Sequence, residues 1–258
     1  MEPITLVILT ALAMWTGIGL GRMLQSHLPP EHLQGESRDM IRTASGLLGT
    51  VVALTIGLLV GSAKSTFDQA NEGVISLSTK VIQLDQALRR FGPTTEPLRA
   101  ELRESMQQGR DLLWVSREPV SRRLKEAQRM RRFNAVVQQI EQIPVDTKGQ
   151  ELTRKEAAKL AGAVGRAVWQ VMEKSEQQLP PPLIVMLILW LSLLFFSFGL
   201  LSPGNTTATG AMILSSLAMT GALFMLLEMN QPFDGFIEAS QGPLDTMLET
   251  LANAAESV

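Results

Sequence analysis

The sequence contains no cysteine and only two histidines among its 258 residues. Without cysteine there is no disulfide framework, no thiolate nucleophile and no cysteine-based metal site. The two histidines, His27 and His32, lie in a short polar segment, and their spacing matches no strong metal-binding motif. The sequence also lacks a phosphate-binding glycine loop, a zinc-protease motif and a nucleophile elbow. We therefore predict no catalytic residue, no cofactor and no metal, and we expect the protein not to be an enzyme.

Charged residues are missing from three long stretches. Residues 177–227 form 51 consecutive positions without Asp, Glu, Lys or Arg, and residues 3–21 and 43–63 are shorter stretches of the same kind. A charge at the centre of a bilayer is costly, and a helix of about 20 residues spans the hydrocarbon core. We therefore predict an all-α, polytopic membrane protein. Its four transmembrane helices are expected at about residues 4–24, 44–64, 183–202 and 207–228.

The predicted spans divide the chain into four parts. Residues 1–64 hold the first two transmembrane helices, and residues 181–229 hold the last two. Residues 65–180 form a soluble helical insertion between helices two and three, because this region shows no strand-like alternation of apolar residues. Residues 230–258 form a tail with five acidic residues and no basic one, whereas residues 64–180 carry 20 Lys and Arg against 15 Asp and Glu. The insertion and the tail can therefore attract one another, although surface charges interact weakly.

An apolar repeat of 3.5 residues begins inside the second predicted span and continues beyond it over 43 positions. Such a repeat predicts one continuous helix, from about residue 45 to residue 91, whose apolar side faces another helix. At 1.5 Å per residue this helix would be roughly 70 Å long. Gly92 and Pro93 follow, and both residue types favour the end of a helix. The repeat consists of Gly49, Ala53, Ile56, Val60, Ala63, Phe67, Ala70, Val74, Leu77, Val81, Leu84, Leu88 and Phe91.

Three more helices are predicted in the insertion, at about residues 95–115, 119–142 and 152–179. Apolar residues recur at helical spacing in each of them. The last helix is expected to begin with a capping box, in which the side chains of Thr153 and Glu156 bind each other's backbone amides.

The second predicted span also carries a stripe of small and polar residues. Short, wettable side chains are what a pore-lining helix needs, and small residues are equally what two tightly packed membrane helices need. The sequence leaves both interpretations open. The candidate pore-facing or helix-packing residues are Gly46, Thr50, Ala53, Gly57, Gly61 and Lys64.

Glu228 is the first charged residue after the 51 uncharged positions, so it lies near the end of the fourth predicted span. A charge at a helix end is ordinary, and Pro232 can simply end the helix. Lys64, at the end of the second span, should lie at a similar depth in the membrane. The alternative interpretation is therefore an interfacial ion pair between Glu228 and Lys64.

Five blocks of sequence cover most of the chain outside about residues 115–180. They are LPPEHLQGESRDMIR (28–42), GLLGTVVALTIGLLVGSAKSTFD (46–68), LDQALRRFGPTTEPLR (84–99), LWLSLLFFSFGLLSPGNTTA (189–208) and LLEMNQPFDGFIEASQGPL (226–244). Together and in this order, the blocks resemble the bestrophin-like domain family of bacterial membrane proteins, which is named for a domain of unknown function.

The resemblance implies four spans with a helical insertion between the second and the third, which is the layout of the bestrophin anion channels. Those channels are ring-shaped oligomers in which span two lines the pore. This chain departs from the pattern in two places, because span two lacks the proline and phenylalanine of bestrophin pore necks, and Asn230 stands where the family usually has an acidic residue. The family motif at the junction between the fourth span and the tail comprises Glu228, Asn230, Pro232, Phe233 and Gly235.

From the residues and the resemblance we expect a homo-oligomeric ion channel, for anions by analogy, with the second transmembrane helix nearest the axis. The alternative is a non-conducting membrane scaffold or regulatory module that binds a partner through its insertion. The expected partners are the lipid bilayer, further copies of the chain and inorganic ions, with no nucleic acid. We expect a multi-pass protein of the bacterial inner membrane, with the insertion and both termini in the cytoplasm.

Overall fold

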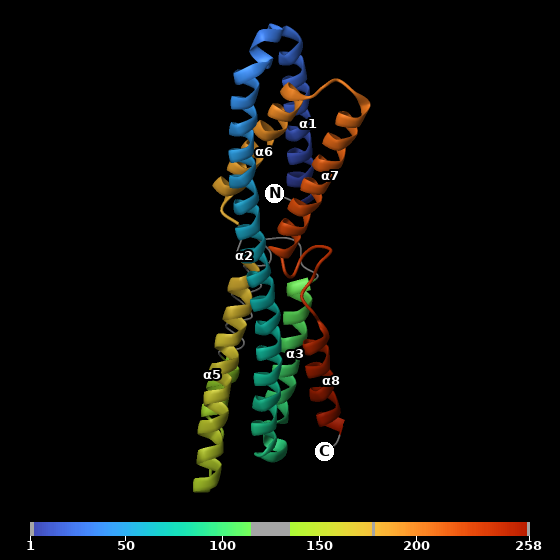
Figure 1. The fold of residues 1–258 in the computed structure, drawn as a ribbon. Helices are drawn as coiled ribbons and strands as arrows, with labels where there is room; N and C mark the ends of the chain where they lie inside the picture. Colours follow the sequence, from blue (N-terminus) through green and yellow to red (C-terminus); the bar gives the residue numbers. More distant parts are fainter. Residues whose placement is uncertain (1–2, 115–134, 177–178, 257–258) are drawn as a thin grey trace. The chain divides into compact units, whose positions relative to one another are not determined.

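The protein is described here by a computed structural model, which defines residues 3–114, 135–176 and 179–256. These residues form helices and connecting segments, and they contain no strand (Figure 1). The all-α fold expected from the sequence is therefore confirmed. The chain divides into two compact units. Unit 1 consists of Met1–Ser65 and Gln178–Asn230, and unit 2 consists of Thr66–Gln177 and Gln231–Val258.

Four helices in the described part of the chain are long and apolar enough to cross a membrane. They are α1 (Pro3–His27), α2 (Gly35–Arg89), α6 (Pro181–Leu201) and α7 (Thr206–Met229). They confirm the four predicted spans, and the boundaries of α1, α6 and α7 differ from the prediction by at most three residues. Helix α2 begins nine residues earlier than predicted, directly after a short 3-10 helix, Pro30–Leu33. It is a single helix of 55 residues.

Helices α1 and α6 lie side by side and pack closely at three glycines (Figure 1). A Cβ atom added at Gly17 would lie 2.5 Å from the carbonyl oxygen of Ser192. A Cβ added at Gly21 would collide with the backbone of Phe196, and one added at Gly199 would collide with the backbone of α1. Membrane helices associate through such close backbone contact at small residues. These glycines therefore fix the distance between the first and third spans.

Replacing Gly21 with alanine tests this contact. The added methyl group has to push α1 away from α6, so we expect Gly21→Ala to lower the free energy of unfolding by about 1–3 kcal/mol, as overpacking does elsewhere. Gly19→Ala is the matched control, because within the described residues a Cβ at Gly19 meets no atom within 4 Å. Both variants gain the same helix propensity. Equal melting temperatures of the two variants in detergent, followed by circular dichroism, would contradict the proposed packing.

Unit 2 contains an apolar core to which the predicted repeat of α2 contributes. The repeat positions from Ala70 to Leu88 are buried, which confirms this part of the prediction. Inside the span the repeat is buried only in part within the described chain, because Ala53 and Val60 are exposed whereas Ala63 is buried. An α-helix drifts by about 20° per seven residues relative to a 3.5-residue repeat, and a membrane allows apolar residues on every side of a helix. Besides Ala63, the buried residues of α2 inside the span are Ser45, Val52 and Leu59.

Three further helices belong to unit 2. They are α3 (Glu96–Trp114), α5 (Lys148–Glu176) and α8 (Gly242–Glu256). Residues 135–141 are also helical, and the rest of the helix predicted at 119–142 lies outside the described residues. Helix α8 was not predicted, although apolar residues recur at helical spacing in this part of the tail. Its buried apolar residues nevertheless join the core of unit 2, and they are Leu244, Met247, Leu248 and Leu251.

Helix α5 begins four residues before its predicted start. The Thr147 hydroxyl accepts a hydrogen bond from the backbone amide of Gln150 (3.2 Å), and the side-chain oxygen of Gln150 accepts one from the amide of Thr147 (3.2 Å). This reciprocal pair is a capping box with glutamine as its second residue. The box predicted at Thr153 and Glu156 is therefore wrong, and the Thr153 hydroxyl instead donates to the carbonyl of Gly149 inside the helix (3.1 Å).

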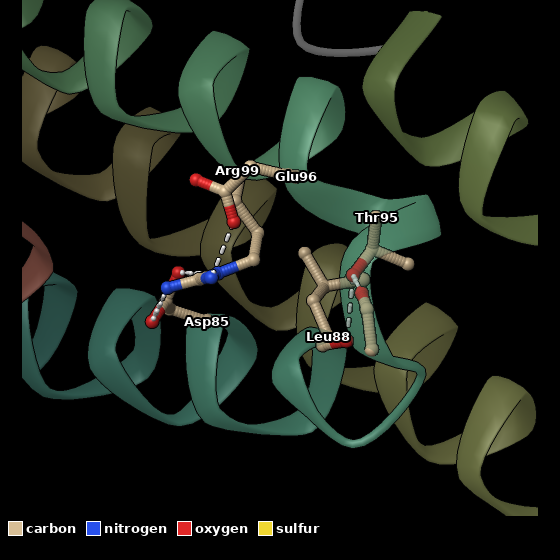
Figure 2. Close-up of polar contacts among 6 residues, drawn as sticks. Asp85, Leu88, Thr95, Glu96 and Arg99 are labelled. Carbon is tan, nitrogen blue, oxygen red and sulfur yellow. Dashed lines mark hydrogen bonds and ion pairs between the residues drawn. The ribbon is translucent and has the colours of Figure 1, made fainter. Parts of the chain in front are cut away.

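The hairpin between α2 and α3 ends α2 as the sequence predicts (Figure 2). Gly92 adopts a positive φ of 78°, a conformation that glycine takes without strain. The 3-10 helix Gly92–Thr95 then leads directly into α3. The buried Thr95 hydroxyl donates a hydrogen bond to the carbonyl of Leu88 (2.8 Å), so one of the unpaired carbonyls at the end of α2 is satisfied.

Candidate functional site

The six residues singled out on the second span lie on one exposed side of α2. Their spacing of three or four residues keeps them on a single face of a helix with 3.6 residues per turn. Each of the six is exposed in the described structure. We call this the small-residue face, and it consists of Gly46, Thr50, Ala53, Gly57, Gly61 and Lys64.

The glycines of the small-residue face have open space beside them. A Cβ atom added at Gly46, Gly57 or Gly61 meets no atom of the described chain within 4 Å. Gly17 and Gly21 of α1, in contrast, are in close contact with α6. The hydroxyl of Thr50 donates a hydrogen bond to the carbonyl of Gly46 (3.0 Å), so this polar group is satisfied within the helix itself. The face is therefore smooth and uncovered by the described part of its own chain.

Large apolar residues flank the small-residue face on α2. Leu47, Leu54 and Leu58 are 68%, 65% and 77% exposed. Large apolar side chains suit lipid tails or the surface of another membrane helix. The exposed side of α2 thus has two halves of different chemistry, one small and partly polar, the other large and apolar.

Glu228 is 2% exposed and lies next to the last residue of α7, Met229. Asn230 follows as the residue that ends the helix, and it is also buried. Pro232 follows the helix end by two residues, a position where proline is common because it cannot continue a helix. Lys64 is exposed on α2. The ion pair between Glu228 and Lys64 stays a prediction.

The other junction residues belong to unit 2, where they shape the loop before α8. Phe233 is buried and its ring packs edge-to-face on the ring of Trp114, with centroids 5.1 Å apart. The carbonyl of Pro232 accepts a hydrogen bond from the amide of Ala239 (2.6 Å), which closes the loop. Gly235 has a positive φ of 140°, which residues with a side chain rarely adopt. These residues therefore build a defined loop and contribute an aromatic anchor to unit 2.

A buried ion pair in the α2–α3 hairpin was not predicted from the sequence. The guanidinium of Arg99 donates to both carboxylate oxygens of Asp85, at 2.7 and 3.2 Å, and to Glu96 at 2.6 Å (Figure 2). Arg99 and Asp85 are each 3% exposed. Burial by itself lowers the pKa of Arg99, but the hydrogen bond and charge of Asp85, with those of Glu96, outweigh it and raise the pKa above its usual value. The hairpin is therefore held in register by a bidentate charge pair.

The sequence does contain a signal for this pair. Asp85 precedes Gly92 by seven residues and Arg99 follows it by seven. A helical hairpin that turns at Gly92 therefore places the two residues opposite each other. An acid and a base at equal distances from a helix-ending glycine can be recognised without a structure. The prediction missed it because it considered only apolar residues in this part of the chain.

Among the described residues, the expected attraction between the insertion and the tail includes an ion pair between α3 and α8 of unit 2. Arg110 of α3 donates a hydrogen bond to Asp245 of α8, with an N–O distance of 2.8 Å. The hydrogen bond to Asp245 raises the pKa of Arg110, and burial opposes it only in part. Both side chains are partly exposed, so the pair contributes little beyond orienting α8 on α3.

Residues 3–114, 135–176 and 179–256 contain no group of three or more His, Asp or Glu that could hold a metal ion. His27 is the last residue of α1, and its Nδ1 lies 2.8 Å from the carbonyl oxygen of Met23. His32 lies in the separate 3-10 helix, and both histidines are exposed.

A comparison with protein families decides the family of the chain. The model of the bestrophin-like domain matches residues 12–244. The chain belongs to the bestrophin-like family. Because the chain has four helices that are apolar enough to cross a membrane and belongs to this family, it is a multi-pass membrane protein. Among curated proteins, the sequence comparison finds no match.

Solved structures of a bacterial bestrophin homologue from Klebsiella pneumoniae share the fold of this bestrophin-like chain. The structure phased with zinc has a TM-score of 0.71 at 12% identity, and the alignment covers 99% of each chain. A variant with an isoleucine-to-threonine substitution has a TM-score of 0.70 at 13% identity and covers 99% of this chain and 100% of its own. A variant with a tryptophan-to-alanine substitution reaches 0.74 at 12% identity, covering 99% of each chain. At such low identity the likeness establishes the fold.

Neutralising Glu228 and Lys64 separately and together tests their predicted pairing. We expect Glu228→Gln and Lys64→Gln each to lower the thermal stability of the detergent-solubilised protein, because each leaves the other charge without its partner. The double variant should lose less than the sum of the two single losses, since paired charges couple by about 0.5–3 kcal/mol.

Lys159, which is exposed on α5 in unit 2, provides the control for this cycle. Combining Glu228→Gln with Lys159→Gln should give additive effects, because the predicted pair does not involve Lys159. If Glu228→Gln and Lys64→Gln are also additive, Glu228 is an ordinary charge at the end of a helix.

Proposed function

We propose that this bestrophin-like protein is a homo-oligomeric ion channel in which α2 lies nearest the axis and the small-residue face lines the pore. The observation that carries the proposal is that this face, on a membrane span, is uncovered by the described part of its own chain. Glycine, alanine and threonine offer little apolar area, so contact with lipid stabilises them little. A water-filled pore needs short side chains and a wettable surface, and this face supplies both.

A pore along the small-residue face requires several copies of the chain. The opposite side of α2 is already occupied, because Val52, Leu59 and Ala63 are buried in the apolar core of unit 1. The large apolar residues beside the small-residue face, such as Leu54 and Leu58, suit contact with a neighbouring copy. The bestrophin layout, with span two around the pore of a ring, supports the same arrangement.

The four-part division of the chain gives each segment a role in this proposal. Residues 1–64 and 181–229 form the conducting membrane part. Residues 65–180 form the insertion, whose first helix is the continuation of α2 beyond the membrane, and residues 230–258 add α8 to the same helical unit. The junction motif, with Phe233 in a defined loop, links the last span to α8.

Recordings from the purified protein in planar bilayers test the channel directly. We expect unitary currents, and a native mass that is a multiple of the mass of the chain. Replacing Lys64 with glutamate should shift the reversal potential in a salt gradient towards cations, because the charge at one end of the pore face changes sign. Lys159→Glu is the matched control, since Lys159 is exposed in unit 2 and should leave the reversal potential unchanged.

The same recordings distinguish the alternative function. Silent bilayers, together with a uniform monomer by native mass, would contradict the channel. That result would favour a non-conducting scaffold or regulatory module that binds a partner through the insertion. Currents that respond equally to Lys64→Glu and Lys159→Glu would place the pore away from the small-residue face.

We further propose that the protein lies in the bacterial inner membrane, with unit 2 and both termini in the cytoplasm. Positively charged residues near the ends of the spans do not decide the orientation, because Arg22, Arg38 and Arg42 on one side nearly balance the lysines and arginines on the other. The bestrophin layout supports a cytoplasmic insertion.

Single cysteines test the orientation, and the lack of native cysteine removes any background. Ser37 and Gln83 are both exposed, on parts of α2 that lie beyond opposite ends of the uncharged stretch. In intact spheroplasts a membrane-impermeant thiol reagent should label Ser37→Cys, and it should label Gln83→Cys only after lysis. The reverse pattern would invert the proposed orientation.

A further inference from the structure

Arg103 is a charged residue of unit 2 whose hydrogen bonds are incomplete. It lies on α3 and is partly buried, and its Nε and Nη2 atoms are buried without a hydrogen-bond acceptor among the described residues. Leaving a buried donor unpaired costs free energy, and the cost is larger when the group is charged. Almost all buried polar groups in folded proteins have a partner. The unpaired edge of Arg103 therefore indicates an acceptor that the described chain does not supply.

Two other arginines on the same side of α3 are paired. Arg99 uses its Nε and Nη2 atoms to bind both carboxylate oxygens of Asp85. Arg110 binds Asp245 of α8. The Nε and Nη2 atoms form the edge of a guanidinium that fits two oxygens of one carboxylate or phosphate. Because Arg103 presents the same two atoms without an acceptor, the group that matches them best is an oxyanion.

The unpaired arginine lies on the side of α3 that faces α8. Arg103 precedes Arg110 by seven residues, which is about 10.5 Å along the helix and only about 20° around it. Helix α8 runs antiparallel to α3, towards the hairpin between α2 and α3 (Figure 1). The residue seven positions after Asp245 is Ala252, so a methyl group lies where an acceptor is needed. Glu249, three residues earlier, is exposed and binds neither of the buried nitrogens.

The part of α8 beside Arg103 is the loosely held part of this helix. The buried apolar residues of α8 lie between Leu244 and Leu251, and residues 252–254 are not buried. The ion pair between Arg110 and Asp245 is partly exposed, so it adds little to the attachment of the helix. The last turns of α8 can therefore move away from α3 while its first turns stay in the core.

A phosphate group of the membrane is too far away to reach Arg103. The pair of Asp85 and Arg99 places Arg103 level with Val81 in the α2–α3 hairpin. Val81 comes 18 residues after Ala63, the last residue of the uncharged stretch, which is about 27 Å along α2. An oxyanion that binds Arg103 must therefore come from solution.

We propose that Arg103 is a cryptic binding site for a small soluble oxyanion, a phosphate or a carboxylate, which opens when the end of α8 moves away from α3. Both nitrogens are buried while the helix is in place, so the anion binds only the open form. A ligand that binds one of two conformations shifts the equilibrium towards it by the factor 1 + [L]/Kd. The anion thus releases the end of α8, and the docked α8 hides the site. The inference is independent of the proposed channel function, because all its residues belong to unit 2.

Hydrogen–deuterium exchange of the intact protein in detergent measures this opening. The measured quantity is the exchange rate of the backbone amides in α8, with the amides of α5 as an internal reference. Inorganic phosphate is compared with potassium chloride at the same ionic strength and pD. If phosphate binds the open form with a Kd of about 25 mM, about 50 mM phosphate should raise the α8 rate about threefold. The rate of α5 should stay unchanged.

Two substitutions remove the site in different ways. Arg103→Met removes the guanidinium and keeps a long side chain, and Ala252→Glu places a carboxylate of the chain itself opposite the guanidinium. Each should slow the exchange of α8 in chloride by about fivefold or more, because no buried donor is left unpaired, and each should abolish the phosphate effect. Arg166→Met on α5 and Asn253→Glu on α8 are the matched controls, since both residues are exposed. Both controls should keep the threefold effect.

Three results would overturn the site. Phosphate can accelerate α8 equally in wild-type protein and in Arg103→Met, which would place the anion elsewhere. Phosphate can leave wild-type α8 unchanged, which would show that no oxyanion binds Arg103. Ala252→Glu can fail to slow the exchange, which would show that α8 does not cover the arginine. The α5 reference reveals whether a variant is folded, and either substitution suffices for the test if the other unfolds the protein. Because no current is measured, the result also leaves the channel proposal untouched.

Discussion

Hydrocarbon does not solvate charge, and this constraint decides where the charged residues of the chain lie. In α2 it leaves 21 uncharged residues between Arg42 and Lys64. The interior of unit 2 is subject to the same constraint, and there the buried guanidinium of Arg99 is held by Asp85 and Glu96. A charge that is removed from water needs a partner in protein as in lipid. The spans meet this requirement by excluding charge, and the hairpin meets it by pairing charge.

Glycine has two different roles in the membrane helices. Gly17, Gly21 and Gly199 allow the backbones of α1 and α6 to touch, whereas Gly57 and Gly61 have open space around them in the described structure. Both pairs, 17–21 and 57–61, have the same spacing of four residues in the sequence. Spacing alone therefore cannot tell a packed glycine from an open one. What separates them is whether another helix of the same chain reaches that side, and this depends on the fold.

The sequence predicts the membrane spans well, because the absence of charge is required on every side of a helix in lipid. It also predicts the buried side of α2 from Ala70 to Leu88, because outside the membrane apolar side chains are stabilised by burial away from water. Inside the span the same pattern is buried only in part, as the exposed Ala53 and Val60 show, because lipid accepts apolar residues on any side. The residues of the candidate site could be identified from the sequence by their small size. Their exposure could be known only from the structure. Arg99 was missed because only apolar residues were considered around the predicted turn at Gly92, although Asp85 and Arg99 lie at equal distances from this glycine in the sequence.

Unit 2 is built from two separate stretches of the chain, and the 53 residues from 178 to 230 come between them. Its core includes Met247 and Leu251 of α8, which are almost completely buried. A ribosome must therefore synthesise two further membrane spans before the last core helix exists. During that interval the apolar surfaces that α8 will cover are open to water and to chaperones. A chain truncated after α7 would keep all four spans but would lack α8, so the core of unit 2 would be incomplete and susceptible to proteolysis.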